Sequence, residues 1–136
     1  MYSHIMTPID LTHADRLSKA LKTTSDLARH YGAKVTFVGV TGVQPGPVAK
    51  NPEEYAVKLA DFAAQQAQSD GIEATSHAVT AHDPATELDH LLVKAAESIG
   101  ADLIVAGTHV PSMFGGHSHG GAVATHSAAS VVLVRG

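Results

Sequence analysis

Short apolar runs of strand type alternate with longer segments of helical period along the chain. Five runs are rich in β-branched and other apolar residues and have the length of strands. They cover residues 5–9, 34–40, 72–79, 102–106 and 130–134. This alternation is typical of a parallel sheet covered by helices. We therefore predict an α/β fold with one doubly wound, five-stranded parallel sheet and helices on both of its faces.

Three of the intervening segments carry apolar residues at the spacing of one helix face. The three stripes are Ala14, Leu17, Leu21, Ala28 and Tyr31; Ala56, Leu59, Ala60, Ala63 and Ala67; and Leu88, Leu91, Leu92, Ala95 and Ile99. Each stripe is followed by a glycine just before the next predicted strand, at Gly32, Gly71 and Gly100. Glycine readily takes the left-handed conformation that ends a helix. Asp83 and Pro84 predict a helix start, with Asp83 as its cap.

The order of the strands decides where a ligand binds. A chain of 136 residues can bury one sizeable core, so we predict a single domain over residues 1–136. In a doubly wound sheet, ligands bind outside the carboxyl ends of the strands where the order reverses. In the order 3-2-1-4-5 the ends of the first, second and fourth strands place Asp10, Val40 and Gly107 at one crevice. Periodicity alone also allows an order in which the first and third strands flank the reversal. The long loop 41–52, with three prolines and two glycines, is the predicted lid.

Composition narrows the classes of partner. The formal net charge is −4 and no run of Lys or Arg is present, so we expect no nucleic-acid partner. The chain has no cysteine, which excludes disulfides, thiolate catalysis and cysteine zinc sites and suits a reducing compartment. The amino terminus does not resemble a signal peptide, and no apolar stretch has the length of a membrane span. We predict a cytoplasmic soluble protein without a membrane partner.

Several stretches resemble the universal stress protein family. They are IMTPIDLTHADRLSKAL, KVTFVGV, AHDPATEL and ADLIVAGTH, with HSAASVVLVR at the end, so the likeness covers essentially the whole chain. The resemblance implies the order 3-2-1-4-5 and an adenine nucleotide, ATP or AMP, as ligand. It implies that Asp10 meets adenine, that Val40 packs on the base, and that a glycine loop from Gly107 holds ribose and phosphates. Pro8 and His109 join these residues as nucleotide-binding candidates.

The glycine loop departs from the family motif, which is Gly, two residues, Gly, nine residues, Gly, then Ser or Thr. Gly107 matches the first glycine, but the second position holds Val110. Pro111 follows and removes a backbone amide where phosphate would lie. Counting onward reaches Gly120 and then Gly121, which has no hydroxyl.

An alternative register anchors the loop on the tail HSAASVVLVR. It places Ser118 at the Ser/Thr position and His117 at the last glycine, with a loop three residues shorter than usual. We prefer this register, because Ser118 then caps a short final helix over residues 119–126. Gly115 and Gly116 remain as amide donors to an anion just before that helix. We therefore expect the chain to bind the nucleotide more weakly than a member with the complete motif.

Each candidate also has a structural interpretation. Asp10 is suited to an Asx turn that leads into the first helix, with Thr12 as the helix cap. A valine at the position of Val40 is commonly a core residue. Ser118 is a helix cap whether or not a nucleotide binds.

Metal binding and catalysis have weaker sequence support. His109, His117 and His119 share one loop, but no acidic or cysteine partner is spaced nearby, so we expect no metal site. The sequence has no phosphate-binding Walker lysine and no nucleophile elbow. His13, His109 and Asp10 are the residues that an acid/base set would use, yet nothing in the sequence orients them. We therefore favour a binding protein over an enzyme.

Three hypotheses follow for function. The first is a stress-response or signalling protein that binds an adenine nucleotide. The second is a member of the same family that binds no nucleotide and acts as a dimeric interaction module. The third is a metal-binding or enzymatic variant based on the histidines. The final strand, residues 130–134, is apolar on both faces and ends the sheet in the order 3-2-1-4-5, so we predict a homodimer through this edge.

Overall fold

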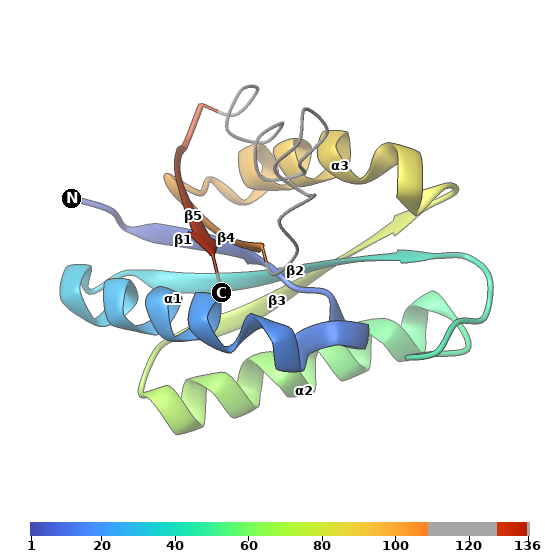
Figure 1. Ribbon diagram of the computed structural model, residues 1–136, viewed down its shortest axis with the longest axis horizontal. Coiled ribbons are helices and arrows are strands. Elements are labelled where there is room, and N and C mark those ends of the chain that lie inside the picture. The colour runs from blue at the N-terminus through green and yellow to red at the C-terminus, as the bar shows by residue number, and fades with distance from the viewer. Residues whose placement is uncertain (109–127, 136) are drawn as a thin grey trace.

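The computed structural model describes residues 1–108 and 128–135, which form one parallel sheet flanked by helices (Figure 1). The strands are β1 (His4–Pro8), β2 (Lys34–Gly42), β3 (Ala74–Ala81), β4 (Leu103–Thr108) and β5 (Ser130–Arg135). The helices are the 3-10 helix η1 (Leu11–Leu17) and the α-helices α1 (Ser18–Tyr31), α2 (Pro52–Asp70) and α3 (Pro84–Ile99).

The sheet order is β3-β2-β1-β4-β5, and every pairing is parallel. This confirms the predicted fold and selects the order 3-2-1-4-5 from the two that periodicity allows. Figure 1 shows α1 and α2 on one face of the sheet and α3 on the other. The order reverses at β1, which lies between β2 and β4, so the carboxyl ends of β1 and β4 flank the reversal.

Two hydrophobic clusters, one on each face, hold the helices on the sheet. Alternate residues of each strand point to opposite faces, so neighbours such as Ile5 and Met6 enter different clusters. The buried residues on the side of α1 and α2 are Ile5, Ile9, Leu17, Ala20, Ala28, Ala33, Val35, Phe37, Tyr55, Leu59, Ala63, Leu103, Val105 and Val134. On the side of α3 they are Met6, Val38, Leu92, Ala95, Ala96 and Ile104.

The helix ends follow the local sequence. Gly32, Gly71 and Gly100 have φ of 64°, 66° and 75°, as predicted for the residues that end α1, α2 and α3. The third helix begins after Asp83, but the Asp83 side chain makes no capping hydrogen bond. Instead, the Asp83 backbone N–H donates to the Glu87 carboxylate over 2.8 Å, so the glutamate supplies the contact that stabilises this helix start.

The five strands lie within two residues of their predicted bounds, and two of them, β3 and β4, begin later in the chain than predicted. The prediction starts the third strand at Ile72, whereas β3 begins at Ala74. The Ile72 N–H donates to the Ala67 carbonyl and so belongs to the end of α2. Asp102, predicted as the first residue of the fourth strand, precedes β4 and accepts hydrogen bonds from the backbone N–H groups of Ser3 and His4.

The predicted loop 41–52 is shorter in the structure, because β2 continues through Gly42 and α2 begins at Pro52. The Gly46 N–H donates to the Ala49 carbonyl over 2.9 Å, and Lys58 of α2 donates to the Val48 carbonyl. Side chains of the loop also pack against the cluster under α1 and α2. A lid function for this loop stays a prediction.

Candidate functional site

The carboxyl ends of β1, β2 and β4 bring four of the predicted site residues to one end of the sheet. Pro8 is the last residue of β1 and pairs with Val38. Asp10 follows two residues later, Val40 lies in β2, and Gly107 is the second-last residue of β4. The other five, His109, Gly115, Gly116, His117 and Ser118, lie outside the described residues, as does the predicted final helix.

Asp10 forms a tight polar turn as the chain leaves β1. Its Oδ1 accepts a hydrogen bond from the Thr12 N–H over 3.0 Å, and its Oδ2 lies 2.9 Å from Nδ1 of His13. The Asx turn proposed as the structural role of Asp10 is therefore present. The helix cap is wrong in the prediction, because Asp10 itself, not Thr12, is the N-cap of η1. Both oxygens bond locally, yet a carboxylate oxygen has room for a second donor.

The Asp10 and His13 side chains remain accessible, with 57% and 42% of their surface exposed. They are two members of the acid/base set considered from the sequence, and the third, His109, lies outside the described residues. An exposed carboxylate held by its own turn is a preformed acceptor for a ligand N–H group. The arrangement therefore suits recognition of a donor at the end of β1.

Val40 points to the other face of the sheet. Its side chain is partly buried against the cluster that contains Met6, Val38 and Leu92 under α3. This is the core role expected for a valine in a central strand. Contact between Val40 and a nucleotide base stays a prediction.

Gly107 packs directly against the start of α1. A Cβ atom on Gly107 would lie 2.8 Å from the Ala20 Cβ and 3.0 Å from the Leu17 Cδ2. Contacts this short do not occur between well-packed carbons, so any larger residue would push α1 away from β4. Sequence reasoning assigned Gly107 to a phosphate-binding loop alone. The structure gives this glycine a packing role that requires no ligand.

Tyr55 is a residue of this end of the sheet that sequence reasoning missed. It lies in the first turn of α2, where its ring covers Gly39 of β2. Burial, together with the nearby negative charge of Asp10, raises the pKa of Tyr55 to about 12. The helical spacing of Tyr55 with Leu59 and Ala63 could have identified it as a buried residue.

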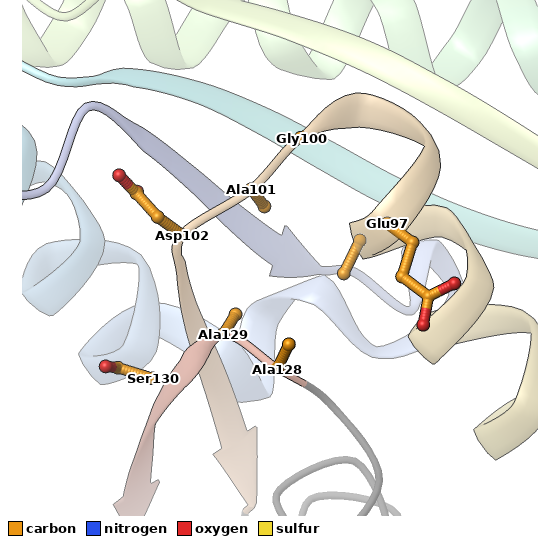
Figure 2. Close-up of a pocket in the computed structure, with 8 residues that line it drawn as sticks. Glu97, Gly100, Ala101, Asp102, Ala128, Ala129 and Ser130 are labelled. Atoms are coloured by element: carbon orange, nitrogen blue, oxygen red, sulfur yellow. The ribbon is translucent and has the colours of Figure 1, made fainter.

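A separate cavity of about 410 Å³ lies at the opposite, amino-terminal end of β4 and β5 (Figure 2). Its lining is Ala96, Glu97, Gly100, Ala101, Asp102, Ala128, Ala129 and Ser130. Figure 2 shows the Asp102 side chain directed away from Ala128 and Ala129. The Asp102 carboxylate instead accepts hydrogen bonds from both N–H and Oγ of Ser3. The cavity thus offers mainly small apolar side chains and backbone.

Asp102 also holds the backbone of His4, whose side chain is buried. Burial tends to raise the pKa of Asp102, but the hydrogen bonds from Ser3 and His4 outweigh it and lower that pKa. The His4 Nε2 lies 2.6 Å from the Thr36 Oγ1. Burial lowers the pKa of His4, and the positive charge of Lys34 lowers it further. The fold therefore favours neutral His4.

Within the described ranges, no three His, Asp or Glu side chains are grouped as metal ligands. The histidines weighed as metal ligands, His109, His117 and His119, fall between those ranges. No helix in the part of the chain that the structure describes has both the length and the apolar character needed to cross a membrane.

The sequence profile of the universal stress protein family matches residues 1–135. No curated protein sequence matches the chain. Solved structures share its fold. A universal stress protein in complex with cAMP is 19% identical with a TM-score of 0.74, covering 98% of this chain and 97% of that chain.

Two further structures contain other nucleotides. The universal stress protein from Archaeoglobus fulgidus in complex with dAMP is 23% identical, covers 98% of each chain and has a TM-score of 0.71. A family protein from Arabidopsis thaliana with AMP bound is 12% identical, covers 98% of this chain and 91% of that chain, and also has a TM-score of 0.71. At these identities the likeness shows the fold.

Proposed function

The chain belongs to the universal stress protein family, and we propose that it is a stress-response protein that binds an adenine nucleotide at the carboxyl ends of β1 and β4. One observation carries the proposal. The exposed carboxylate of Asp10 lies at the reversal of the sheet, where ligands of doubly wound folds bind. Family structures in complex with cAMP, dAMP and AMP support the choice of ligand class.

In this proposal Asp10 accepts a hydrogen bond from the amino group of adenine. Its own turn holds the carboxylate in place before the ligand arrives, so little ordering is needed on binding. The phosphates would meet the segment after Gly107. Since Val110 and Pro111 interrupt the motif there, each charge-assisted bond that is lost costs about 1–3 kcal/mol. Binding about tenfold to a hundredfold weaker than with the full motif is expected.

Titration calorimetry tests this function. The protein is titrated with AMP and with ATP and magnesium, and Asp10→Asn is compared with Asp15→Asn. Asp10→Asn keeps an oxygen for the Thr12 N–H and removes the charge, so it should fold and bind AMP about tenfold more weakly. Asp15, an exposed acid of the same 3-10 helix, is the matched control and should bind as the native chain does.

The outcome of the titration separates the hypotheses. Absence of heat with every nucleotide at millimolar concentration would reject nucleotide binding and favour the interaction module. Equal AMP affinity in the Asp10→Asn and Asp15→Asn variants would place the nucleotide elsewhere. A separate titration with zinc tests the third hypothesis, since heat with zinc and none with any nucleotide would favour histidine-based metal binding. The cytoplasmic location stays a prediction.

We also propose that the chain forms a homodimer through β5, as the sequence predicts. Within the described residues β5 ends the sheet, so one edge of its backbone has no neighbouring strand. Leu133 of this strand is a large apolar side chain with 38% of its surface exposed. A twofold axis at the edge would bury it and pair the two backbones.

Sedimentation of paired variants tests the dimer. Leu133→Lys should convert a dimer to a folded monomer, because it places two like charges across the axis. Val57→Lys, which changes an apolar residue of α2 with 61% exposure, should remain dimeric. A native chain that sediments as a monomer at micromolar concentration would contradict the proposal.

A further inference from the structure

The first turn of α2 places an aromatic ring beside the proposed nucleotide site. Asn51 caps this helix, since its side chain accepts a hydrogen bond from the Glu54 N–H over 2.8 Å. The Tyr55 N–H then donates to the Asn51 carbonyl over 3.1 Å and starts the helical ladder. Figure 1 shows the amino end of α2 at the same end of the sheet as the carboxyl end of β2. The cap therefore sets the position of the Tyr55 ring.

The ring lies against bare backbone. A Cβ on Gly39 would lie 2.4 Å from the Tyr55 hydroxyl oxygen, 3.0 Å from Cε1 and 3.1 Å from Cζ. Gly39 directly follows Val38, whose carbonyl accepts a hydrogen bond from the Ile9 N–H at the end of β1. The hydroxyl is therefore held over β2 next to the point where the chain turns into Asp10. The influence of Asp10 on Tyr55 agrees with this placement.

The Tyr55 hydroxyl has no hydrogen-bond partner in the part of the chain that the structure describes. Tyr55 is only 6% exposed, and its hydroxyl makes no hydrogen bond to residues 1–108 or 128–135. Buried tyrosine hydroxyls in folded proteins ordinarily have a hydrogen-bond partner, because leaving one unsatisfied is unfavourable. A buried donor that residues 1–108 and 128–135 leave unsatisfied, close to the Asp10 carboxylate, is the kind of group that a ligand satisfies.

The chemistry of the two groups defines that missing partner. With its high pKa, Tyr55 is protonated at neutral pH and is a donor, whereas the Asp10 carboxylate accepts hydrogen bonds. The hydroxyl lies over Gly39 of β2 and the carboxylate follows the neighbouring strand β1, so a donor and an acceptor lie at the same end of the sheet. The edge of adenine offers the complement, since its amino group donates and the neighbouring ring nitrogen accepts.

We infer that Tyr55 is a base-reading residue, whose hydroxyl donates to a ring nitrogen of the adenine while Asp10 accepts from its amino group. This inference rests on the nucleotide function proposed above and adds to it a residue from α2. The inference also explains why a glycine, Gly39, lies opposite the Tyr55 ring. Only glycine at position 39 lets the ring lie close enough to the strand for the hydroxyl to reach the end of β1.

Tyr55→Phe tests the inference because it removes the hydroxyl and keeps the ring. AMP binding should weaken about tenfold, the loss of one buried hydrogen bond. Tyr31→Phe is the matched control, since Tyr31 packs edge-on to Tyr2 at the end of α1 and should leave AMP affinity unchanged. Without nucleotide, the thermal midpoint of Tyr55→Phe should equal or exceed that of the native chain, because no bond is lost.

Each result has a distinct meaning. If the native chain binds AMP and Tyr55→Phe binds it with the same affinity, the role of Tyr55 is overturned, whereas the nucleotide function stands. A native chain that binds no adenine nucleotide overturns both. A lower thermal midpoint for nucleotide-free Tyr55→Phe would show that the hydroxyl already has a partner in the free protein, which also overturns the inference.

Discussion

Replacement of Gly107 by alanine separates a packing role from a nucleotide role at the best-matched glycine of the motif. The new Cβ would lie 2.8 Å from the Ala20 Cβ and 3.0 Å from the Leu17 Cδ2. The leucine methyl can rotate away, but the Ala20 Cβ is attached directly to the backbone of α1. We therefore expect α1 to shift from β4 and the native state to lose stability even when no nucleotide is present.

Two opposing effects set the magnitude. Overpacking a core contact costs about 1–3 kcal/mol. The change from glycine to alanine also restricts the unfolded chain, which returns about 0.4–1 kcal/mol. The net loss in the free energy of unfolding should be about 1–2 kcal/mol, and the thermal midpoint should fall by about 4–8 °C for a chain of this size. If Gly107 served only to bind nucleotide, Gly107→Ala would leave the stability of the nucleotide-free protein unchanged.

A double-mutant cycle identifies the atom responsible. Ala20→Gly removes the Cβ that blocks the new methyl and itself costs about 1 kcal/mol in the helix. In that background Gly107→Ala should cost almost nothing, which gives a coupling energy of about 1–2 kcal/mol. Gly42→Ala is the matched control in β2, because its Cβ would meet the nearest atom, Pro84 Cγ, at an ordinary 3.4 Å.

Urea denaturation followed by far-UV circular dichroism gives the free energies of unfolding for the native chain, the three variants of the cycle and Gly42→Ala. Gly107→Ala should be less stable than Gly42→Ala, and the double variant should match Ala20→Gly. Equal stability of Gly107→Ala and Gly42→Ala would refute the packing argument. Strictly additive costs in the cycle would show that Ala20 is not the obstacle.

Three further predictions concern stability. The pKa of His4 lies below its ordinary 6.5, so the unfolded chain binds this proton more readily than the folded chain does. The contribution of neutral His4 to the free energy of unfolding is therefore fully present above pH 6.5 and is lost as the pH falls below it. In denaturation curves His4→Gln should flatten this pH dependence, and replacement of the exposed His30 by Gln should not. Asn51→Ala should cost about 0.5–2 kcal/mol through loss of the α2 cap, and Asn51→Asp should preserve the cap; equal stability of the two would contradict this. Gly100→Ala should cost about 1 kcal/mol at φ of 75°, whereas Gly46→Ala, with open space around it, should match the native thermal midpoint.

The sequence by itself determined the elements of this protein and their type. Strand runs and helical stripes are local patterns, and so are the glycines at positions 32, 71 and 100 that end the helices. The turn at Asp10 is also local, since its partners Thr12 and His13 lie within three residues. Such features depend on neighbours in the chain and can be predicted without coordinates. The strand order required the family resemblance in addition to periodicity.

Only the tertiary structure decided which distant residues share a contact. Tyr55 covers Gly39, Ala20 meets Gly107, and Asp102 accepts from Ser3 across 99 residues of chain. Periodicity assigns a residue to the buried face of its element, but it does not state which residue of another element lies opposite. That choice depends on the order of the strands and on how closely each helix approaches the sheet. For this reason the sequence placed Asp10 and Gly107 at the reversal of the sheet, whereas the buried Tyr55 ring over Gly39 became apparent only once α2 was packed on the sheet.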